Sequence, residues 1–301
     1  MDNIGITPCF DASCVFQGRY RSTPCGTPKR ESIFNQGIRN TQVNRSRLSP
    51  SAGILLRPNL KTRFRYQWRQ WINRLRKSDR DPNNILNDDL LGYPTNHTYQ
   101  IRKGEIIAQG KVARRWRMVS PLYPLQIQSF LDVGCCKGYF VFRVAQRPEC
   151  ECAVGIDLFP HFIDVSQRAA RALALRNVQI QMASIEDVAA NPSAYGGPFD
   201  LVQVISAYHY IYWGSKRVEK SMGDHDSIMS GLAKVCARYL VFMNPLEISD
   251  CPLEIQKLAE STSDHDYTRE GFLSAAQKYF DVFEVGLDDS GKRPIMLLAR
   301  R

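Results

Sequence analysis

The sequence lacks long apolar runs, and this absence excludes a membrane-spanning protein. No stretch approaches the roughly 18 to 20 consecutive apolar residues that cross a bilayer. The first 30 residues also lack the apolar segment of a secretory signal. We therefore expect a soluble protein with no transmembrane segment.

A cysteine framework and a metal motif are missing as well. The nine cysteines are odd in number and irregularly spaced, which is typical of reduced thiols in the cytoplasm. Cys150 and Cys152 lack both the two-residue spacer and the second ligand pair of a zinc motif. Two Asp-His-Asp sequences, at residues 224–226 and 264–266, are typical of helix caps. We predict a cytoplasmic location and no metal site.

Phosphate-binding signatures are absent too. The chain has no Walker-type GKS or GKT sequence, which excludes the usual phosphate cradle. It also lacks the G-x-G-x-x-G order of a dehydrogenase, so hydride transfer to a nicotinamide cofactor is disfavoured.

Positive charge is plentiful, and it is concentrated early in the chain. Residues 1–129 contain 22 Lys and Arg against 8 Asp and Glu, a net charge of +14. The remainder contains 18 against 22, a net charge of −4. A basic extension beside a slightly acidic domain suggests an anionic partner such as RNA, and a solvated basic tail is the alternative.

Composition divides the chain into three regions. Residues 1–60 are polar, rich in Pro and Gly, and without periodicity, which predicts a disordered tail. A targeting segment or a mis-chosen start would have a similar composition. Residues 61–124 predict a basic helical extension, in which residues 62–77 form an amphipathic helix with two tryptophans. That helix either packs on the next domain or follows phosphates or a membrane surface.

From residue 125 to residue 301, short apolar runs alternate with helical patterns. FLDVG, CAVGIDL, VQIQMAS, FDLVQVIS and YLVFMNP predict buried strands, with helices such as 162–175 and 227–237 between them. This alternation indicates a parallel sheet covered by helices on both faces. After a helix near residues 268–279, VFEVGL and PIMLLAR are separated only by DDSGKR, which predicts an antiparallel hairpin.

Glycine and acidic residues follow the first three predicted strands. The turn DVGCCKG places Gly134 and Gly138 where a cofactor can approach the backbone. Asp157 ends the second strand, where a carboxylate can accept hydrogen bonds from two ribose hydroxyls. The sequence SIED, residues 184–187, follows the third strand. Asp157 alone would be read as a helix cap, but these residues share one sheet edge and together predict a nucleoside site.

These landmarks make residues 125–301 resemble the class I S-adenosylmethionine-dependent methyltransferase superfamily. Its members carry a D-x-G-x-G-x-G turn after the first strand, and here Cys136 replaces the middle glycine. The resemblance implies an α/β fold with a Rossmann-like, seven-stranded, mostly parallel sheet, an antiparallel C-terminal hairpin and helices on both faces. It also implies S-adenosylmethionine as the cofactor.

By the same resemblance, Asp157 would bind the ribose and residues 184–186 would flank the adenine, with Asp132 and Gly134 near the methionine part. The implied cofactor-binding set consists of ten residues: Asp132, Gly134, Cys135, Gly138, Asp157, Leu158, Ser184, Ile185, Glu186 and Ser206.

The segment SAYHYIYWG, residues 206–214, follows the fourth strand, where the superfamily places groups next to the reactive methyl. The N/D-P-P-Y/F sequence of many amino-directed enzymes is absent, which favours oxygen, carbon or carboxylate acceptors. We predict His209 as the base that removes a hydroxyl proton, with Tyr208 as a second catalytic candidate. A histidine held among aromatic side chains for structural reasons is the alternative.

We predict a methyltransferase that acts on an unidentified small-molecule or RNA acceptor. The three turns also resemble those of enzymes that modify wobble uridine in transfer RNA. An RNA acceptor would give the basic residues 61–117 a role in phosphate binding. The alternative is a non-catalytic adaptor that binds the cofactor and nucleic acid, as suggested by Cys136 and the lack of a clear acid/base pair.

Overall fold

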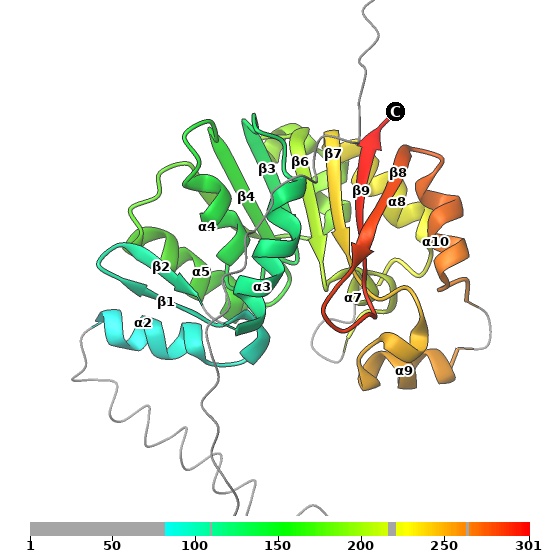
Figure 1. Cartoon of the computed structure of the whole chain (residues 1–301), viewed down its shortest axis with the longest axis horizontal. Helices are drawn as coiled ribbons and strands as arrows, with labels where there is room; N and C mark the ends of the chain where they lie inside the picture. The colour runs from blue at the N-terminus through cyan, green and yellow to red at the C-terminus, as the bar shows by residue number, and fades with distance from the viewer. Residues whose placement is uncertain (1–81, 109, 216–220, 263–264) are drawn as a thin grey trace, which may run out of the picture. The chain divides into compact units, whose positions relative to one another are not determined.

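The structure is a computed structural model, and it describes residues 82–108, 110–215, 221–262 and 265–301 (Figure 1). The predicted tail at 1–60 and the predicted amphipathic helix at 62–77 lie outside the described residues. None of the described helices is both long and apolar enough to cross a membrane.

Seven strands form the central sheet of the described chain: β3 Ser129–Val133, β4 Cys152–Asp157, β5 Val178–Met182, β6 Phe199–Ile205, β7 Cys236–Met243, β8 Phe280–Leu287 and β9 Pro294–Arg300. Their order is β5-β4-β3-β6-β7-β9-β8. β9 runs antiparallel to both of its neighbours, and the other pairings are parallel. The predicted seven-stranded, mostly parallel sheet with a C-terminal hairpin is therefore confirmed.

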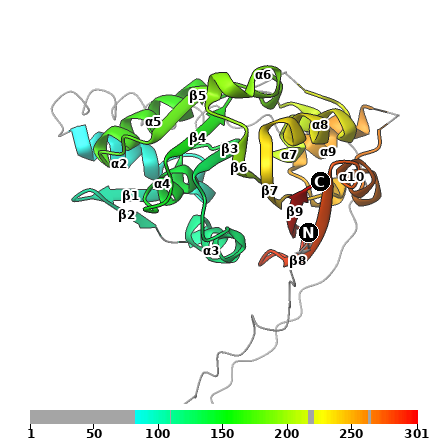
Figure 2. The ribbon, with the colours of Figure 1, turned by 90° about the horizontal axis from the view of Figure 1, so that it is seen from above.

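Helices cover both faces of this sheet. One face carries α4 Tyr139–Ala145 and α5 Pro160–Ala172, and the other carries α6 Ile185–Ala190, α8 His225–Val235 and α10 Arg269–Ala276. Seen from above, α4 lies on one side of the strands and α6 and α8 on the other (Figure 2). The central strands are buried on both faces, which explains their continuous apolar sequences.

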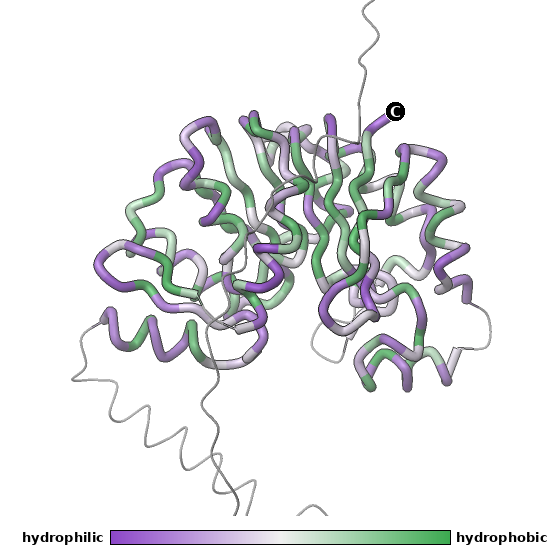
Figure 3. Tube along the Cα trace, viewed as in Figure 1, coloured by the Kyte–Doolittle hydropathy of each residue, from purple (hydrophilic) through white to green (hydrophobic). Residues whose placement is uncertain are grey.

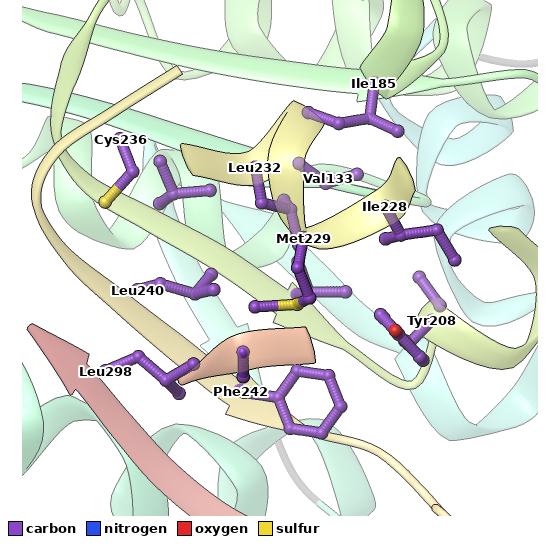
Figure 4. Packing of buried hydrophobic residues seen from close by; sticks show 14 of the residues in the cluster. Val133, Ile185, Tyr208, Ile228, Met229, Leu232, Cys236, Leu240, Phe242 and Leu298 are labelled. Atoms are coloured by element: carbon purple, nitrogen blue, oxygen red, sulfur yellow. The ribbon is translucent and has the colours of Figure 1, made fainter. Parts of the chain in front are cut away.

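The side chains of each face form one apolar cluster. Apolar residues concentrate along the strands (Figure 3). On the α8 face, Ile228, Met229 and Leu232 pack over Phe242 and Leu298 of the sheet (Figure 4). Burial of such side chains contributes on the order of 2 kcal/mol each, so these clusters hold the helices against the sheet.

Local signals fix where several helices begin. The carboxylate of Asp224 accepts a hydrogen bond from the Ser227 amide at 2.7 Å and so caps α8, which begins two residues earlier than predicted. Pro160 occupies the first turn of α5, where its missing N–H costs nothing. α8 ends at Val235 because Cys236 already belongs to β7.

The described part of the predicted extension packs onto the same core as the sheet. It contains α2 Pro82–Leu91, the hairpin strands β1 Tyr99–Arg102 and β2 Glu105–Ala108, and α3 Gly110–Val119. The Tyr99 hydroxyl donates to the Lys137 carbonyl at 2.5 Å. The buried Lys137 ammonium in turn donates to the carbonyls of Leu90 and Gly92. The extension is thereby tied to the turn that follows β3.

The remaining short elements lie in the connections. They are η2 Thr95–His97, η3 Ser120–Leu122, η4 Pro192–Tyr195, α7 Tyr208–Trp213, η5 Ile248–Asp250 and α9 Leu253–Glu260.

Candidate active site

A cavity of about 310 Å³ lies at the carboxyl ends of the parallel strands. Its walls come from the turns after β3, β4, β5 and β6, from the segment between α2 and β1, from α3, from α9 and from the β8–β9 connection. This edge is where ligands of open α/β sheets bind.

Eight of the twelve predicted site residues line this cavity: Gly134, Asp157, Leu158, Ser184, Ile185, Glu186, Ser206 and His209. They come from four separate strand ends, and the parallel topology brings them together. Their role in binding a ligand remains a prediction.

Asp157 is held in a fixed orientation at the end of β4. Its two carboxylate oxygens accept hydrogen bonds from the Cys136 and Phe159 amides, each at 2.9 Å. Burial raises the pKa of this carboxyl group, while the backbone hydrogen bonds oppose that shift. Each carboxylate oxygen can accept a further hydrogen bond, so the group can serve a ribose as well as the loop.

The turn after β3 makes a close approach to the end of β6. Gly134 has φ of +77°, and a Cβ at this position would lie 2.5 Å from the Cβ of Ala207. A side chain is therefore excluded both by backbone conformation and by space.

Cys136 adopts a left-handed backbone conformation, with φ of +51°. Its amide binds Asp157, and its carbonyl accepts a hydrogen bond from the Ser166 hydroxyl at 3.0 Å. A non-glycine residue in this conformation costs roughly 1 kcal/mol. The chain thus places a cysteine at a position whose geometry suits glycine, and that cysteine lines the cavity.

Three predicted cofactor residues do not line the cavity. Asp132 is buried beneath the turn, where it accepts a hydrogen bond from the Gln203 amide at 3.0 Å, and burial raises its pKa to about 7. The side chain of Cys135 packs in the core close to Gly155. Gly138 is the N-cap residue of α4, and its missing Cβ leaves room for the ring of Phe142. These residues support the turn rather than face the cavity.

Tyr208 also lies away from the cavity, and the prediction of a catalytic role for it is corrected. Its side chain is fully buried, and its hydroxyl forms a 2.6 Å hydrogen bond with Nδ1 of His225. Because α7 begins at Tyr208, the helical rotation turns this ring into the core and the next residue, His209, toward the cavity.

Ser184 has a structural role that the sequence pattern did not reveal. It is the N-cap of α6, where its hydroxyl accepts from the Asp187 amide and the Asp187 carboxylate accepts from the Ser184 amide. This capping box fixes the start of α6 and so positions Ile185 and Glu186 in the cavity wall.

His209 lies in the cavity wall with its imidazole 2% exposed. Its Nδ1 atom has no hydrogen-bond partner among the described residues. Burial, followed by the positive charges of Arg293 and Arg115, lowers the pKa of His209 to about 3. The ring is therefore neutral at physiological pH and has a lone pair available for a proton or a donor.

Two arginines in the wall were not predicted as site residues. Arg115 is 6% exposed, and its Nη1 atom lies 2.9 Å from Nε2 of His97. Its spacing from Val112 and Val119 puts it on the inner face of α3, which is the sequence signal that could have identified it. Arg293 belongs to the β8–β9 connection and donates to the Asp288 carboxylate at 2.9 Å.

The four basic side chains of α3 therefore have different surroundings. Arg115 turns into the cavity, while Arg114 forms an ion pair with Asp289 at 3.1 Å. Lys111 and Arg117 are exposed. Of these four side chains, Lys111 and Arg117 therefore remain for the phosphate-binding role expected of the basic residues 61–117.

Comparisons with known proteins agree with this geometry. A family model described as a methyltransferase domain matches residues 127–268. The structure of EvdMO1 is 16% identical over 73% of this chain, with a TM-score of 0.50. The chain spans only 47% of the EvdMO1 chain. No curated protein matches the sequence.

Two further solved structures are also similar to this chain. One is the magnesium protoporphyrin IX methyltransferase ChlM from Synechocystis PCC 6803 with bound SAH, 14% identical over 63% of this chain and 80% of that chain, TM-score 0.43. The other is the N-methyltransferase NodS from Bradyrhizobium japonicum WM9, 15% identical over 62% and 97%, TM-score 0.43.

The matched family and the sheet order together identify the class of protein. Residues 127–268 match a methyltransferase domain, and the sheet order with its antiparallel C-terminal hairpin is that of a Rossmann-like methyltransferase fold. The cofactor of this domain is S-adenosylmethionine.

Proposed function

We propose that this chain catalyses methyl transfer to an oxygen atom of a small-molecule acceptor, with His209 as the group that receives the proton. The observation that carries the proposal is the cavity itself, which joins Asp157 and Glu186 with the unpartnered Nδ1 of His209. Small-molecule sites are concave and have a few converging polar groups in an apolar wall, as this cavity has.

The lining residues fit the nucleoside part of the cofactor. Asp157 offers carboxylate acceptors for the ribose hydroxyls, and Leu158 and Ile185 provide apolar walls for the adenine. Gly134 allows close approach to the backbone of the turn. The described turns at this nucleoside end carry no Walker-type sequence, which agrees with a nucleoside that carries no phosphate.

When bound, S-adenosylmethionine supplies a methyl group for in-line displacement, which leaves S-adenosylhomocysteine as product and releases the acceptor proton. The chain's contribution is alignment of the acceptor and removal of that proton. His209 is neutral and buried, so its Nδ1 can accept a hydroxyl proton at the end of β6.

Calorimetry with S-adenosylmethionine and S-adenosylhomocysteine tests the cofactor half of the proposal. Folded full-length protein is expected to bind both compounds. If it binds neither of them, the proposed function is wrong. Incubation with methyl-labelled cofactor and fractionated cell extract then tests transfer. Cofactor binding without transfer to any fraction would favour the non-catalytic adaptor instead.

A second candidate is an RNA acceptor, which the net charge of +14 over residues 1–129 favours. Among the described residues, Arg102, Lys103, Lys111 and Arg117 are exposed and available for phosphates. Phosphate contacts make binding steeply salt-dependent. RNA affinity that is unchanged between low and moderate salt, or that does not depend on the basic residues of 61–117, would reject this candidate. The resemblance to wobble-uridine enzymes stays a prediction.

A further inference from the structure

The charged side chains of the cavity wall are separated along the sheet edge. Asp157 ends β4 and Glu186 lies in the first turn of α6, whereas Arg293 immediately precedes β9. Four strand spacings separate β4 from β9, a distance of about 19 Å at 4.8 Å per strand. His209, which follows β6, lies between these two groups.

Arg115 brings a second positive charge to the arginine end. Burial and then the charge of Arg293 lower its pKa to about 10, so it is protonated at neutral pH. Arg115, Arg293 and His209 all line this cavity, and the charges of the two arginines add to the effect of burial in lowering the pKa of His209. Arg115 and Arg293 therefore line the side of the cavity that is farther from the proposed ribose position.

The positive charge at this end is only partly neutralised within the described chain. Asp288 pairs with Arg293, and this pairing helps to lower the pKa of Asp288. The partner of Arg115 is the imidazole of His97, whose pKa is lowered to about 3, mainly by burial. A neutral imidazole accepts a hydrogen bond but contributes no negative charge.

Unsatisfied polar atoms mark the same region. Nδ1 of His209, Nε of Arg293 and Oγ of Ser206 are buried and have no hydrogen-bond partner among the described residues. A buried polar group without a partner costs about 1 to 3 kcal/mol, and more when it is charged. Three such atoms in one cavity wall are the pattern expected of a site that is completed by a polar ligand.

We propose that Arg115 and Arg293 bind an oxyanion of the methyl acceptor, a carboxylate or phosphate of a small molecule, and thereby hold its reactive oxygen beside His209. This inference rests on the proposed function and specifies its substrate class. Arginine suits the role because its planar guanidinium forms paired hydrogen bonds with oxyanions.

The proposed oxyanion also resolves a difficulty with His209 as a base. Burial, and after it the positive charges of Arg293 and Arg115, make the imidazole bind a proton poorly. An anion between the arginines would offset their charges and raise the pKa of His209 toward the usual 6.5. Binding of the acceptor would thus make His209 a stronger base for the proton that the acceptor releases.

Glu254 is the one acidic lining residue that interrupts this separation of charge. It lies on α9, which packs against α7. Its carboxylate limits where the oxyanion can bind, because an anion beside Glu254 would be repelled. The arginine side of the cavity is consequently the favourable position.

The experiment measures the binding of inorganic phosphate and benzoate to full-length protein saturated with S-adenosylhomocysteine, with benzamide as a neutral probe. We expect millimolar or tighter binding of at least one anion and weaker binding of benzamide. Arg115→Gln and Arg293→Gln should each reduce anion affinity on the order of tenfold or more. Arg293→Lys should retain part of the affinity because it retains the charge.

Neighbouring cations provide matched controls. Arg114→Gln removes an adjacent arginine of α3 that pairs with Asp289 outside the cavity wall. Lys292→Gln removes the residue next to Arg293, which pairs with Asp250. Both controls should leave anion affinity within about twofold of the parent protein, and the thermal unfolding of all variants establishes that they are folded.

Anion binding should also be visible at His209. The NMR titration of its ring protons should move to higher pH when phosphate or benzoate is added, and Arg293→Gln should reduce that movement. His209→Gln identifies the resonance. Equal affinity for benzoate and benzamide, or anion affinity unaffected by both arginine substitutions, would overturn the inference.

The carboxylate of the cofactor is the other source of an oxyanion in this cavity. Methylthioadenosine has the nucleoside and sulfur but no carboxylate, so its binding separates the two sources. Under our proposal, Arg293→Gln binds both S-adenosylhomocysteine and methylthioadenosine as the parent does. If it loses affinity for S-adenosylhomocysteine alone, Arg293 binds the cofactor and the inference is wrong.

Failure of the inference is distinct from failure of the proposed function. A parent protein that binds neither cofactor form fails the proposed function itself. A parent protein that binds S-adenosylhomocysteine and neither anion fails only the acceptor assignment. Methyl label that enters RNA, with no anion binding in the cavity, would favour the RNA acceptor over a small molecule.

Discussion

The two ends of the cavity differ in charge and in how the chain builds them. The acidic end consists of Asp157 and Glu186, which follow consecutive strands of the sheet. The arginine end consists of Arg115 from α3 and Arg293 from the β8–β9 connection, which are 178 residues apart in the sequence. An edge formed by parallel strands is a general platform for a nucleoside, whereas segments laid over that edge can differ in sequence without disturbing the sheet.

The largest expected effect is at His209, which lies between the acidic end and the arginine end of the cavity. His209→Gln should lower kcat by roughly 10²- to 10⁴-fold, the usual contribution of a positioned base. Affinity for S-adenosylhomocysteine should stay within about twofold, because His209 belongs to the acceptor side. Steady-state kinetics on the acceptor found by label transfer, together with calorimetry, measure both quantities. Wild-type kcat in this variant would make His209 a structural residue.

Removing the main acceptor of the acidic end should weaken cofactor binding. Asp157→Ala is expected to reduce affinity for S-adenosylhomocysteine by about 10- to 100-fold, since it loses charge-assisted hydrogen bonds to the ribose and unties Cys136 from Phe159. Asp164→Asn is the control, because Asp164 is exposed on α5 and pairs with Arg168. Calorimetry compares the two variants, and equal affinities would show that Asp157 serves only the loop.

Two buried histidines beside the arginine end and the buried Asp132 beneath the turn after β3 should respond to acid in opposite directions. The pKa values of His97 and His209 are lowered to about 3, so between pH 6.5 and 3 the unfolded chain binds more protons at these positions. Their contribution to stability is therefore lost as pH falls through this window. Asp132, beneath the cofactor turn, has a pKa raised to about 7, so its contribution increases as pH falls from about 7 to 4.

Urea unfolding at pH 6.5 and pH 5.5 measures this difference. His97→Gln should reduce the acid-induced loss of stability by about 1 kcal/mol over that pH unit, and Asp132→Asn should increase the loss by a similar amount. Identical pH dependence in the parent and both variants would mean that these groups titrate alike in the folded and unfolded chain.

The smallest effect is expected at the turn after β3, which contains Cys136. Cys136→Gly removes a side chain from a left-handed residue, and it should preserve or improve cofactor affinity, by no more than a few fold. The change in the free energy of unfolding should be below about 1 kcal/mol, because relief of strain is offset by the greater freedom of glycine in the unfolded chain. Clearly weaker cofactor binding would contradict this interpretation of the turn.

The acidic end could be predicted from the sequence because its residues stand directly after recognisable strands. Asp157 follows the apolar run of β4, and residues 184–186 follow β5, so strand periodicity alone put them on one edge. Asp132 and Cys135 were included in the predicted cofactor-binding set only because they belong to the same turn. Strand alternation and the tightness of the turn direct their side chains into the core instead.

The choice between Tyr208 and His209 could not be made from the sequence. Both follow β6, and only the helical start of α7 determines which of two adjacent side chains faces inward. Arg115 was grouped with the other basic residues of 61–117 for a related reason. A count of charges in residues 111–117 does not show which face of α3 meets the sheet.

The sequence by itself determined the sheet, the hairpin ending, the superfamily and the cofactor, because these depend on local periodicity and on short turns at strand ends. The tertiary structure decided which charges meet across the cavity. The extension and the β8–β9 connection are distant in the chain, and they approach each other only because both pack at the same edge of the sheet. No local sequence pattern shows that Arg115 and Arg293 line the same cavity, so this pair could be identified only from the folded structure.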